Sequence, residues 1–138
     1  MNKYGMLVLA AVLATVYAGA IKGTTDEERA EYNVVHKACQ DDPKTFADEG
    51  LVQKLFEGIF TEDQQLKVHM VCMYKGFHLM KHNGKLNRDV LKRKWAEHAS
   101  GPLLHKLDHC LVEKSTPEET SWELMKCQHN IGVSLYGR

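Results

Sequence analysis

The chain lacks the features by which many enzymes, nucleic-acid-binding proteins and membrane proteins are identified. Its 18 basic and 18 acidic residues give no net charge, so no positive surplus attracts nucleic acid or an anionic membrane. It contains no G-x-S-x-G nucleophile motif, no glycine-rich phosphate loop and no Asn-x-Ser/Thr sequon. We therefore expect a non-enzymatic protein with no N-glycan, no nucleic-acid partner and no stable membrane insertion.

Long apolar runs are also scarce, and the longest one is too short to span a bilayer. Met6–Val16 has about half of the roughly 20 apolar residues that a transmembrane helix needs. Lys3 places a positive charge before the run, and Ala18–Ala20 offers small residues at the two positions that a signal peptidase reads. This pattern predicts a signal peptide over residues 1–20 and a secreted single domain over residues 21–138.

The rest of the chain shows helical periodicity, and no segment alternates apolar and polar residues as a half-buried strand does. Hydroxyl or carboxylate side chains followed by acids mark helix starts. Asn83-Gly84 predicts a turn, and Gly101-Pro102 predicts a break. The expected fold is all-α, a compact bundle of about six helices. The expected helical segments run from Thr25 to about Cys39, over Pro43–Asp48, over Leu51–Phe60, from caps at Thr61–Asp63 to Phe77, from Asn87 to Ala99, from Leu103 to Leu111 and from Thr116 to about Asn130.

Cysteine is rare, but its number is even. Four cysteines behind an export signal predict two disulfide bonds, because disulfides persist in oxidising compartments. Four cysteines allow three pairings, and the residues alone leave the choice open. A bond between Cys110 and Cys127, on the last two expected helices, is compatible with the short connection between them, and it would leave Cys39 to pair with Cys72.

The spacing of the cysteines resembles that of the insect odorant-binding proteins of the pheromone and general odorant-binding type. That family usually carries six cysteines on six helices, with three residues between the second and third and eight between the fifth and sixth. On this pattern the second and fifth would fall at Val68 and Glu118, and neither is cysteine. The chain thus resembles the four-cysteine subgroup often called minus-C. Cys72–Gly76 and Trp122–Cys127 also resemble the family's segments after its third cysteine and in its last helix.

The resemblance implies the disulfides Cys39–Cys72 and Cys110–Cys127, and helices that enclose a hydrophobic cavity. It implies a secreted carrier that binds odorants, pheromones or similar small hydrophobic molecules. Release on acidification, which many members of that family show, is a second interpretation of the eight histidines and stays open. We further expect a membrane receptor as a second candidate partner, a monomer or weak homodimer, and no cofactor or metal. The absent third bridge predicts a looser contact between the helices that carry positions 68 and 118.

Large, soft apolar side chains could line such a cavity, because methionine adapts to irregular ligands. Tyr74 and His98 are candidates to donate one orienting hydrogen bond. The C-terminal tail is a candidate to close one mouth. The expected ligand-binding residues are Val52, Leu55, Phe56, Ile59, Met70, Met73, Tyr74, Phe77, Leu91, Trp95, Leu107, Leu111, Trp122 and Met125, together with Val133, Leu135 and Tyr136 from the tail.

Two other functions fit parts of the sequence. Helical stripes normally close on one another, so a secreted four-cysteine interaction factor with a solid core is the alternative to a carrier. A metal-binding protein is a third hypothesis, because His78 and His82, and likewise His105 and His109, are four residues apart, as metal ligands on a helix can be. Surface histidines on amphipathic helices explain the same spacing without a metal, and no HExxH pattern accompanies them.

Overall fold

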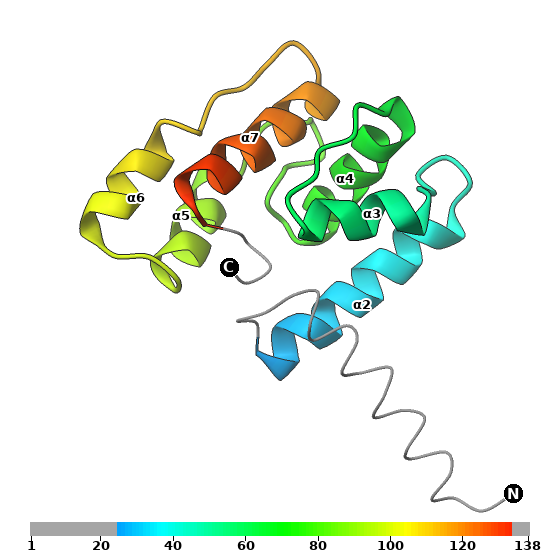
Figure 1. Ribbon diagram of the computed structural model, residues 1–138, viewed down its shortest axis with the longest axis horizontal. Helices are drawn as coiled ribbons and strands as arrows, with labels where there is room; N and C mark the ends of the chain where they lie inside the picture. The colour runs from blue at the N-terminus through cyan, green and yellow to red at the C-terminus, as the bar shows by residue number, and fades with distance from the viewer. Residues whose placement is uncertain (1–24, 134–138) are drawn as a thin grey trace, which may run out of the picture.

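The computed structural model describes residues 25–133, and residues 1–24 and 134–138 lie outside the described part. The described residues form six α-helices, which confirms the all-α class (Figure 1). The expected signal peptide and the tail residues Leu135 and Tyr136 fall outside this range. No helix within residues 25–133 is long and apolar enough to cross a membrane. The helices are α2 (Asp26–Asp41), α3 (Glu49–Phe56), α4 (Gln64–Gly76), α5 (Arg88–Ala96), α6 (Gly101–Asp108) and α7 (Pro117–Ile131).

Three helices begin where the capping signals predict. At the start of α2 the Thr25 hydroxyl accepts from the Glu28 amide at 3.1 Å, and the Glu28 carboxylate accepts from the Thr25 amide at 2.8 Å. Asp63 accepts from a first-turn amide of α4 at 2.8 Å. Thr116 accepts from the Glu119 amide of α7 at 3.1 Å. Each cap satisfies an amide that the helix itself leaves unpaired.

The short helix expected over Pro43–Asp48 is wrong. These residues form a turn, in which the Phe46 amide donates to the Asp42 carbonyl at 2.9 Å, followed by an extended segment. Asp48 instead caps α3, because its carboxylate accepts from the Gly50 amide at 2.7 Å. The acids and proline at 41–43, which predicted a helix start, therefore only end α2 and lead into the turn.

The helix expected to reach Phe60 ends at Phe56. Gly58 has a φ of 81°, which residues with a side chain rarely adopt, and the Ile59 amide donates back to the Lys54 carbonyl at 2.8 Å. This turn takes Ile59 away from the apolar stripe of α3. Its side chain is consequently 49% exposed, and it does not join the buried residues with which it was grouped.

Three smaller expectations also change. Gly101 and Pro102 form the first turn of α6, where a proline is tolerated because its missing N–H has no helical partner. The helix ends at Asp108, so Cys110 lies just beyond it and not within it. Asn87 precedes α5, but its side chain donates to the His78 carbonyl at 3.0 Å and does not cap the helix.

The arrangement of the helices follows from the central pair α4 and α7, which pack against each other (Figure 1). α2 packs against α4, α6 packs against α7, and α5 packs against α6. Gly76 permits a close approach of α2 to α4, because a Cβ at this position would lie 2.4 Å from Cγ1 of Val35. The predicted turn at Asn83-Gly84 is confirmed, with Gly84 at a φ of 86°.

Two disulfides hold outer segments onto the central pair, and they confirm the pairing that the resemblance implies. Cys39–Cys72 joins α2 to α4 across a sequence separation of 33 residues. Cys110–Cys127 joins the segment after α6 to α7 across a separation of 17 residues. None of the described cysteines is free.

The buried apolar side chains form two clusters. The larger cluster has buried members on α2, α4, α5, α6 and α7, and Tyr74, Leu91 and Leu107 in it are fully inaccessible to solvent. The smaller cluster brings α3, α4 and α7 together. It consists of Ala47, Val52, Leu66 and Trp122.

Candidate functional site

Most of the residues expected to contact a ligand have buried side chains, and they divide between the two clusters. Val52 and Trp122 belong to the smaller cluster. Val133, at the end of the described chain, packs into the larger cluster and is 6% exposed. The larger cluster also holds Met70, Met73, Tyr74, Phe77, Leu91, Trp95, Leu107 and Leu111.

Three of the expected residues are only partly buried, and they border both clusters. They are Leu55 and Phe56 on α3 and Met125 on α7, which we call the junction. Apolar surface that stays accessible beside buried clusters gains free energy when another apolar group covers it, at about 25 cal/mol per Å². What distinguishes the junction is that its three side chains pack against both clusters.

A small group of polar side chains lies inside the larger cluster, where α4, α5 and α7 meet. Trp95 donates its indole N–H to the side-chain oxygen of Gln128 at 2.8 Å. Tyr74 lies beside Gln128, but its hydroxyl makes no hydrogen bond of ordinary geometry with any described residue. Burial raises the pKa of Tyr74 far above its usual range, and Gln128 opposes this only in part, so the hydroxyl stays protonated.

A charged network holds α4 against α7 on the side of the smaller cluster. The Lys67 ammonium is 2.9 Å from a carboxylate oxygen of Glu62 and 2.9 Å from one of Glu119. It also lies 5.5 Å from the centroid of the Trp122 ring, and the Trp122 indole N–H donates to Glu62 at 2.8 Å. Hydrogen bonds to Glu119 and Glu62 raise the pKa of Lys67, and the bond from Lys67 is the main cause that lowers the pKa of Glu62.

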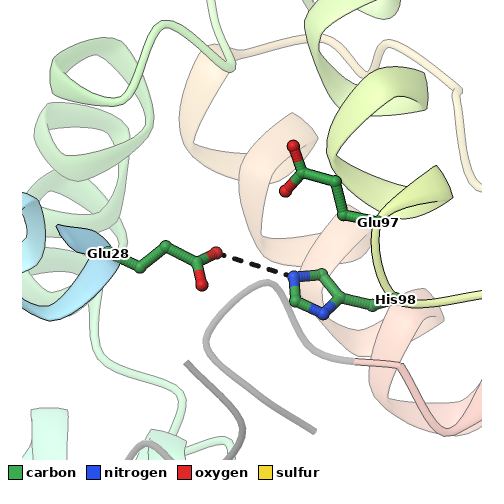
Figure 2. A group of neighbouring side chains, drawn as sticks. All are labelled: Glu28, Glu97 and His98. Carbon is green, nitrogen blue, oxygen red and sulfur yellow. Dashed lines mark ion pairs between the residues drawn. The ribbon is translucent and has the colours of Figure 1, made fainter. Parts of the chain in front are cut away.

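Within residues 25–133, one group of three side chains has the composition and spacing of a metal site (Figure 2). Glu28 comes from the first turn of α2, and Glu97 and His98 follow α5, with ligand atoms within 4.8 Å of one another. Nε2 of His98 is 3.6 Å from Oε2 of Glu28. Burial pushes the pKa of Glu28 upward, but hydrogen bonds with Thr25 and the His98 charge outweigh it and leave the pKa lowered. Because Glu28 already serves the capping box, the group has a structural explanation as a tie between α2 and the end of α5.

Two histidines meet edge to face between α2 and α4, with ring centroids 5.3 Å apart. His69 is fully buried and donates its Nδ1–H to the Thr45 carbonyl at 2.8 Å, while its Nε2 has no partner among the described residues. His36 lies 3.0 Å from the Glu49 carboxylate. Burial lowers the pKa of His69, and the Thr45 hydrogen bond opposes this only in part, so His69 stays neutral near pH 7.

The two histidine pairs with helical spacing do not form a helical metal site. His78 follows the end of α4 and has a φ of 63°, so His78 and His82 are not one turn apart on a helix. His105 and His109 do lie close, with ring centroids 5.4 Å apart. No third histidine, cysteine or carboxylate completes a ligand set with either pair in the described part of the chain.

Sequence reasoning missed two residues that this geometry makes prominent. Gln128 was overlooked although it follows Leu124 and Met125 at i+4 and i+3 on α7, and a polar residue on an apolar stripe indicates a buried polar partner. Lys67 had no comparable signal, because its partner Glu119 is 52 residues away in the sequence.

Comparison with known proteins covers nearly the whole described chain. A sequence model of the PBP/GOBP family matches residues 22–130. The B2 protein of Tenebrio molitor is 25% identical over 123 residues, which are 86% of this chain and 92% of that protein. The B1 protein of the same species is 23% identical over 123 residues, which are 86% of this chain and 91% of that protein. No solved structure matches the chain significantly.

Proposed function

Because the chain belongs to the PBP/GOBP family, whose members are typically secreted and bind small hydrophobic ligands without catalysing a reaction, we propose that it is a secreted carrier of odorants, pheromones or similar semiochemicals. The four cysteines, all paired in disulfides, suit an oxidising extracellular fluid. The ligand occupies an internal cavity and travels with the protein through that fluid.

The observation that carries this proposal is the junction formed by Leu55, Phe56 and Met125. These side chains are apolar, partly accessible and in contact with both buried clusters. A ligand seated there extends a continuous apolar interior. The junction also brings it beside Trp122, since all three residues pack against the smaller cluster.

The expected affinity follows from the size of such ligands. An odorant that buries about 300–400 Å² gains roughly 8–10 kcal/mol at about 25 cal/mol per Å². The loss of its translational and rotational freedom offsets several kcal/mol of this gain. A dissociation constant near the micromolar range follows, which suits a carrier that must also release its ligand.

The experiment is a titration of the exported, leader-processed protein with the apolar fluorescent probe N-phenyl-1-naphthylamine. The wild type is expected to bind the probe with a micromolar dissociation constant. Leu55→Gln places an amide in the junction and should weaken binding about tenfold or more, because the amide loses water without gaining a partner. Ile59→Gln makes the same change at an exposed residue just after the same helix, and it should leave the affinity unchanged.

Two results would contradict the proposal. A folded wild-type protein that binds no probe at any concentration would instead be an interaction factor with a solid core. An equal loss of affinity in Leu55→Gln and Ile59→Gln, with circular dichroism unchanged in both, would place the probe on the surface rather than at the junction.

A further inference from the structure

The side chains of Glu28, Glu97 and His98 lie toward one another where the first turn of α2 approaches the chain after α5. Glu28 extends from α2 toward the His98 ring, and the Glu97 carboxylate lies beside them (Figure 2). Two carboxylate oxygens and one imidazole nitrogen lie within 4.8 Å of one another. With both carboxylates ionised, the group keeps a net negative charge whether or not the imidazole is protonated, so a divalent cation would neutralise it.

The helix cap uses only one of the two carboxylate oxygens of Glu28. Oε1 accepts from the Thr25 amide at 2.8 Å, whereas Oε2 faces Nε2 of His98 at 3.6 Å. This separation is longer than the about 2.7–3.2 Å of an ordinary N–H···O hydrogen bond, and it is close to the roughly 3.3 Å that separates two ligand atoms on a tetrahedral zinc ion. A cation between the two atoms therefore requires little movement of either side chain.

The two residues after α5 are fixed by their backbone, and their side chains remain available. The Glu97 amide donates to the Lys94 carbonyl at 3.2 Å, and the His98 amide donates to the Trp95 carbonyl at 3.0 Å. The side chains of Glu28 and His98 are only 20% and 27% exposed, so fewer water molecules compete for them than at an open surface. The Glu97 carboxylate has no hydrogen bond or ion pair with any residue between 25 and 133.

The types of ligand atom indicate which cation fits. Imidazole nitrogen suits zinc and similar transition-metal ions, whereas Ca²⁺ and Mg²⁺ take oxygen ligands. Zinc often has three protein ligands and a water molecule in the fourth position. A ligand carboxylate must be ionised, and the lowered pKa of Glu28 keeps it so at neutral pH.

We propose that Glu28, Glu97 and His98 bind one Zn²⁺ ion, with water completing the coordination. The ion links the start of α2 to the chain after α5, and in its absence the direct contact between Glu28 and His98 is the link. The sequence gave no signal for this site, because Glu28 is far along the chain from the other two ligands. The site is independent of the proposed carrier function.

The test is a calorimetric titration of the exported, leader-processed protein, made without a histidine tag, with ZnCl₂. The wild type is expected to bind zinc and to give no binding heat with MgCl₂. Glu97→Gln should weaken zinc binding about tenfold or more, because losing even an outer partner of a metal ligand costs about tenfold to a hundredfold. Glu57→Gln makes the same change at an exposed glutamate just after α3 and should leave the affinity unchanged.

Melting temperatures separate the loss of a ligand from damage to the fold. Because Glu97 has no bonded partner in the described chain, metal-free Glu97→Gln should melt at the temperature of the wild type. Added zinc should raise the melting temperature of the wild type, since a ligand that binds only the folded state stabilises it, and should raise that of Glu97→Gln less. His98→Gln should also lose affinity, whereas His105→Gln, which alters the exposed histidine pair, should not.

Three results would overturn the proposal. The first is a folded wild type that gives no binding heat with zinc. The second is zinc affinity that Glu97→Gln and His98→Gln leave unchanged. The third is an affinity that falls in His105→Gln but not in His98→Gln, which would place the ion at the exposed pair.

Discussion

The two faces of α4 are held to their neighbours by different physical means. Towards α2 a disulfide, Cys39–Cys72, fixes the contact covalently. Towards α7 the attachment is noncovalent: it consists of apolar packing and of Lys67, which pairs with Glu119 on α7 and with Glu62 just before α4. This network lies one residue along from Val68 and Glu118, where the family pattern would place a third disulfide.

The difference shows how the contact between the central helices can persist without the bond. A disulfide stabilises mainly by restricting the unfolded chain, whereas the ion pairs act only in the folded state and are partly exposed. The α4–α7 contact should therefore open more easily than the α2–α4 contact. This contact adjoins the smaller cluster and the junction, so under the proposed carrier function we expect a looser α4–α7 contact to ease ligand entry.

The largest effect is expected when a disulfide also joins α4 to α7. The double variant Val68→Cys/Glu118→Cys would close a loop of about 50 residues, which the chain-entropy model values at about 4 kcal/mol of unfolding free energy. Urea denaturation should show this gain in the oxidised but not the reduced protein. Stopped-flow release of N-phenyl-1-naphthylamine should become slower. If the new disulfide forms but changes neither the unfolding free energy nor the rate of probe release, the α4–α7 contact does not open more easily than the α2–α4 contact.

Removing a native disulfide makes the converse change. The Cys39→Ala/Cys72→Ala pair should lose about 3.7 kcal/mol, and Cys110→Ala/Cys127→Ala about 3.1 kcal/mol, because the first bond closes the longer loop. Equilibrium unfolding of the two double variants measures both values. The informative result is which variant loses more unfolding free energy. A larger loss on removal of Cys110–Cys127, which closes the shorter loop, would show that contacts in the folded state and not loop length set the order.

The network itself is tested by a smaller change. Lys67→Met removes the charge but keeps an unbranched side chain that can pack on Trp122, and it should cost about 1 kcal/mol or less because both carboxylates are partly exposed. The loss should shrink at high salt. Lys37→Met removes a fully exposed pair with Asp41 and is the matched control, with no measurable loss expected. Equal losses in the two variants would deny the network a role in the α4–α7 contact.

The smallest expected effect depends on pH and lies on the disulfide-linked side. His69 has a lowered pKa in the folded state, so the unfolded chain takes up its proton first as the pH falls below about 6.5, and stability declines from there until the folded pKa is reached. The groups that face His69 are His36, Glu49 and the Thr45 carbonyl. Glu28 also has a lowered pKa, but its contribution to the stability of the folded state is lost only below about pH 4.5.

Melting temperatures at pH 7.5 and 5.5 test whether His69 causes the loss of stability in this pH range. The wild type should melt at a lower temperature at pH 5.5, and His69→Gln should show a smaller difference between the two pH values. His105→Gln, which changes an exposed histidine, should behave like the wild type. Identical pH dependence in all three proteins would remove His69 as the source of acid sensitivity.

The sequence predicted the features that depend on neighbouring residues. The caps at Thr25, Asp63 and Thr116 were correct because each uses an amide within three residues of itself. The turn over Pro43–Asp48 was assigned to a helix because acids followed by Pro43 resemble a helix start, whereas the start signal that the structure uses is Asp48, which caps α3. Local signals thus place helix starts well and helix ends less well.

The features that depend on the packing of distant segments were not predictable. Trp95 and Gln128 are 33 residues apart, and the bond between them exists only because α5, α6 and α7 pack in succession. The same holds for Lys67 and Glu119. The disulfide pairing lies between these cases: the residues left three possibilities, and the resemblance to a family selected the correct one.

The proposed carrier function requires that the helices enclose a site for a small apolar guest. The most direct test is a crystal structure of the exported protein grown with 1-decanol. The alkyl chain is expected at the junction of Leu55, Phe56 and Met125, beside Trp122. An interior completely filled by the protein's own side chains, with no decanol bound inside, would contradict it.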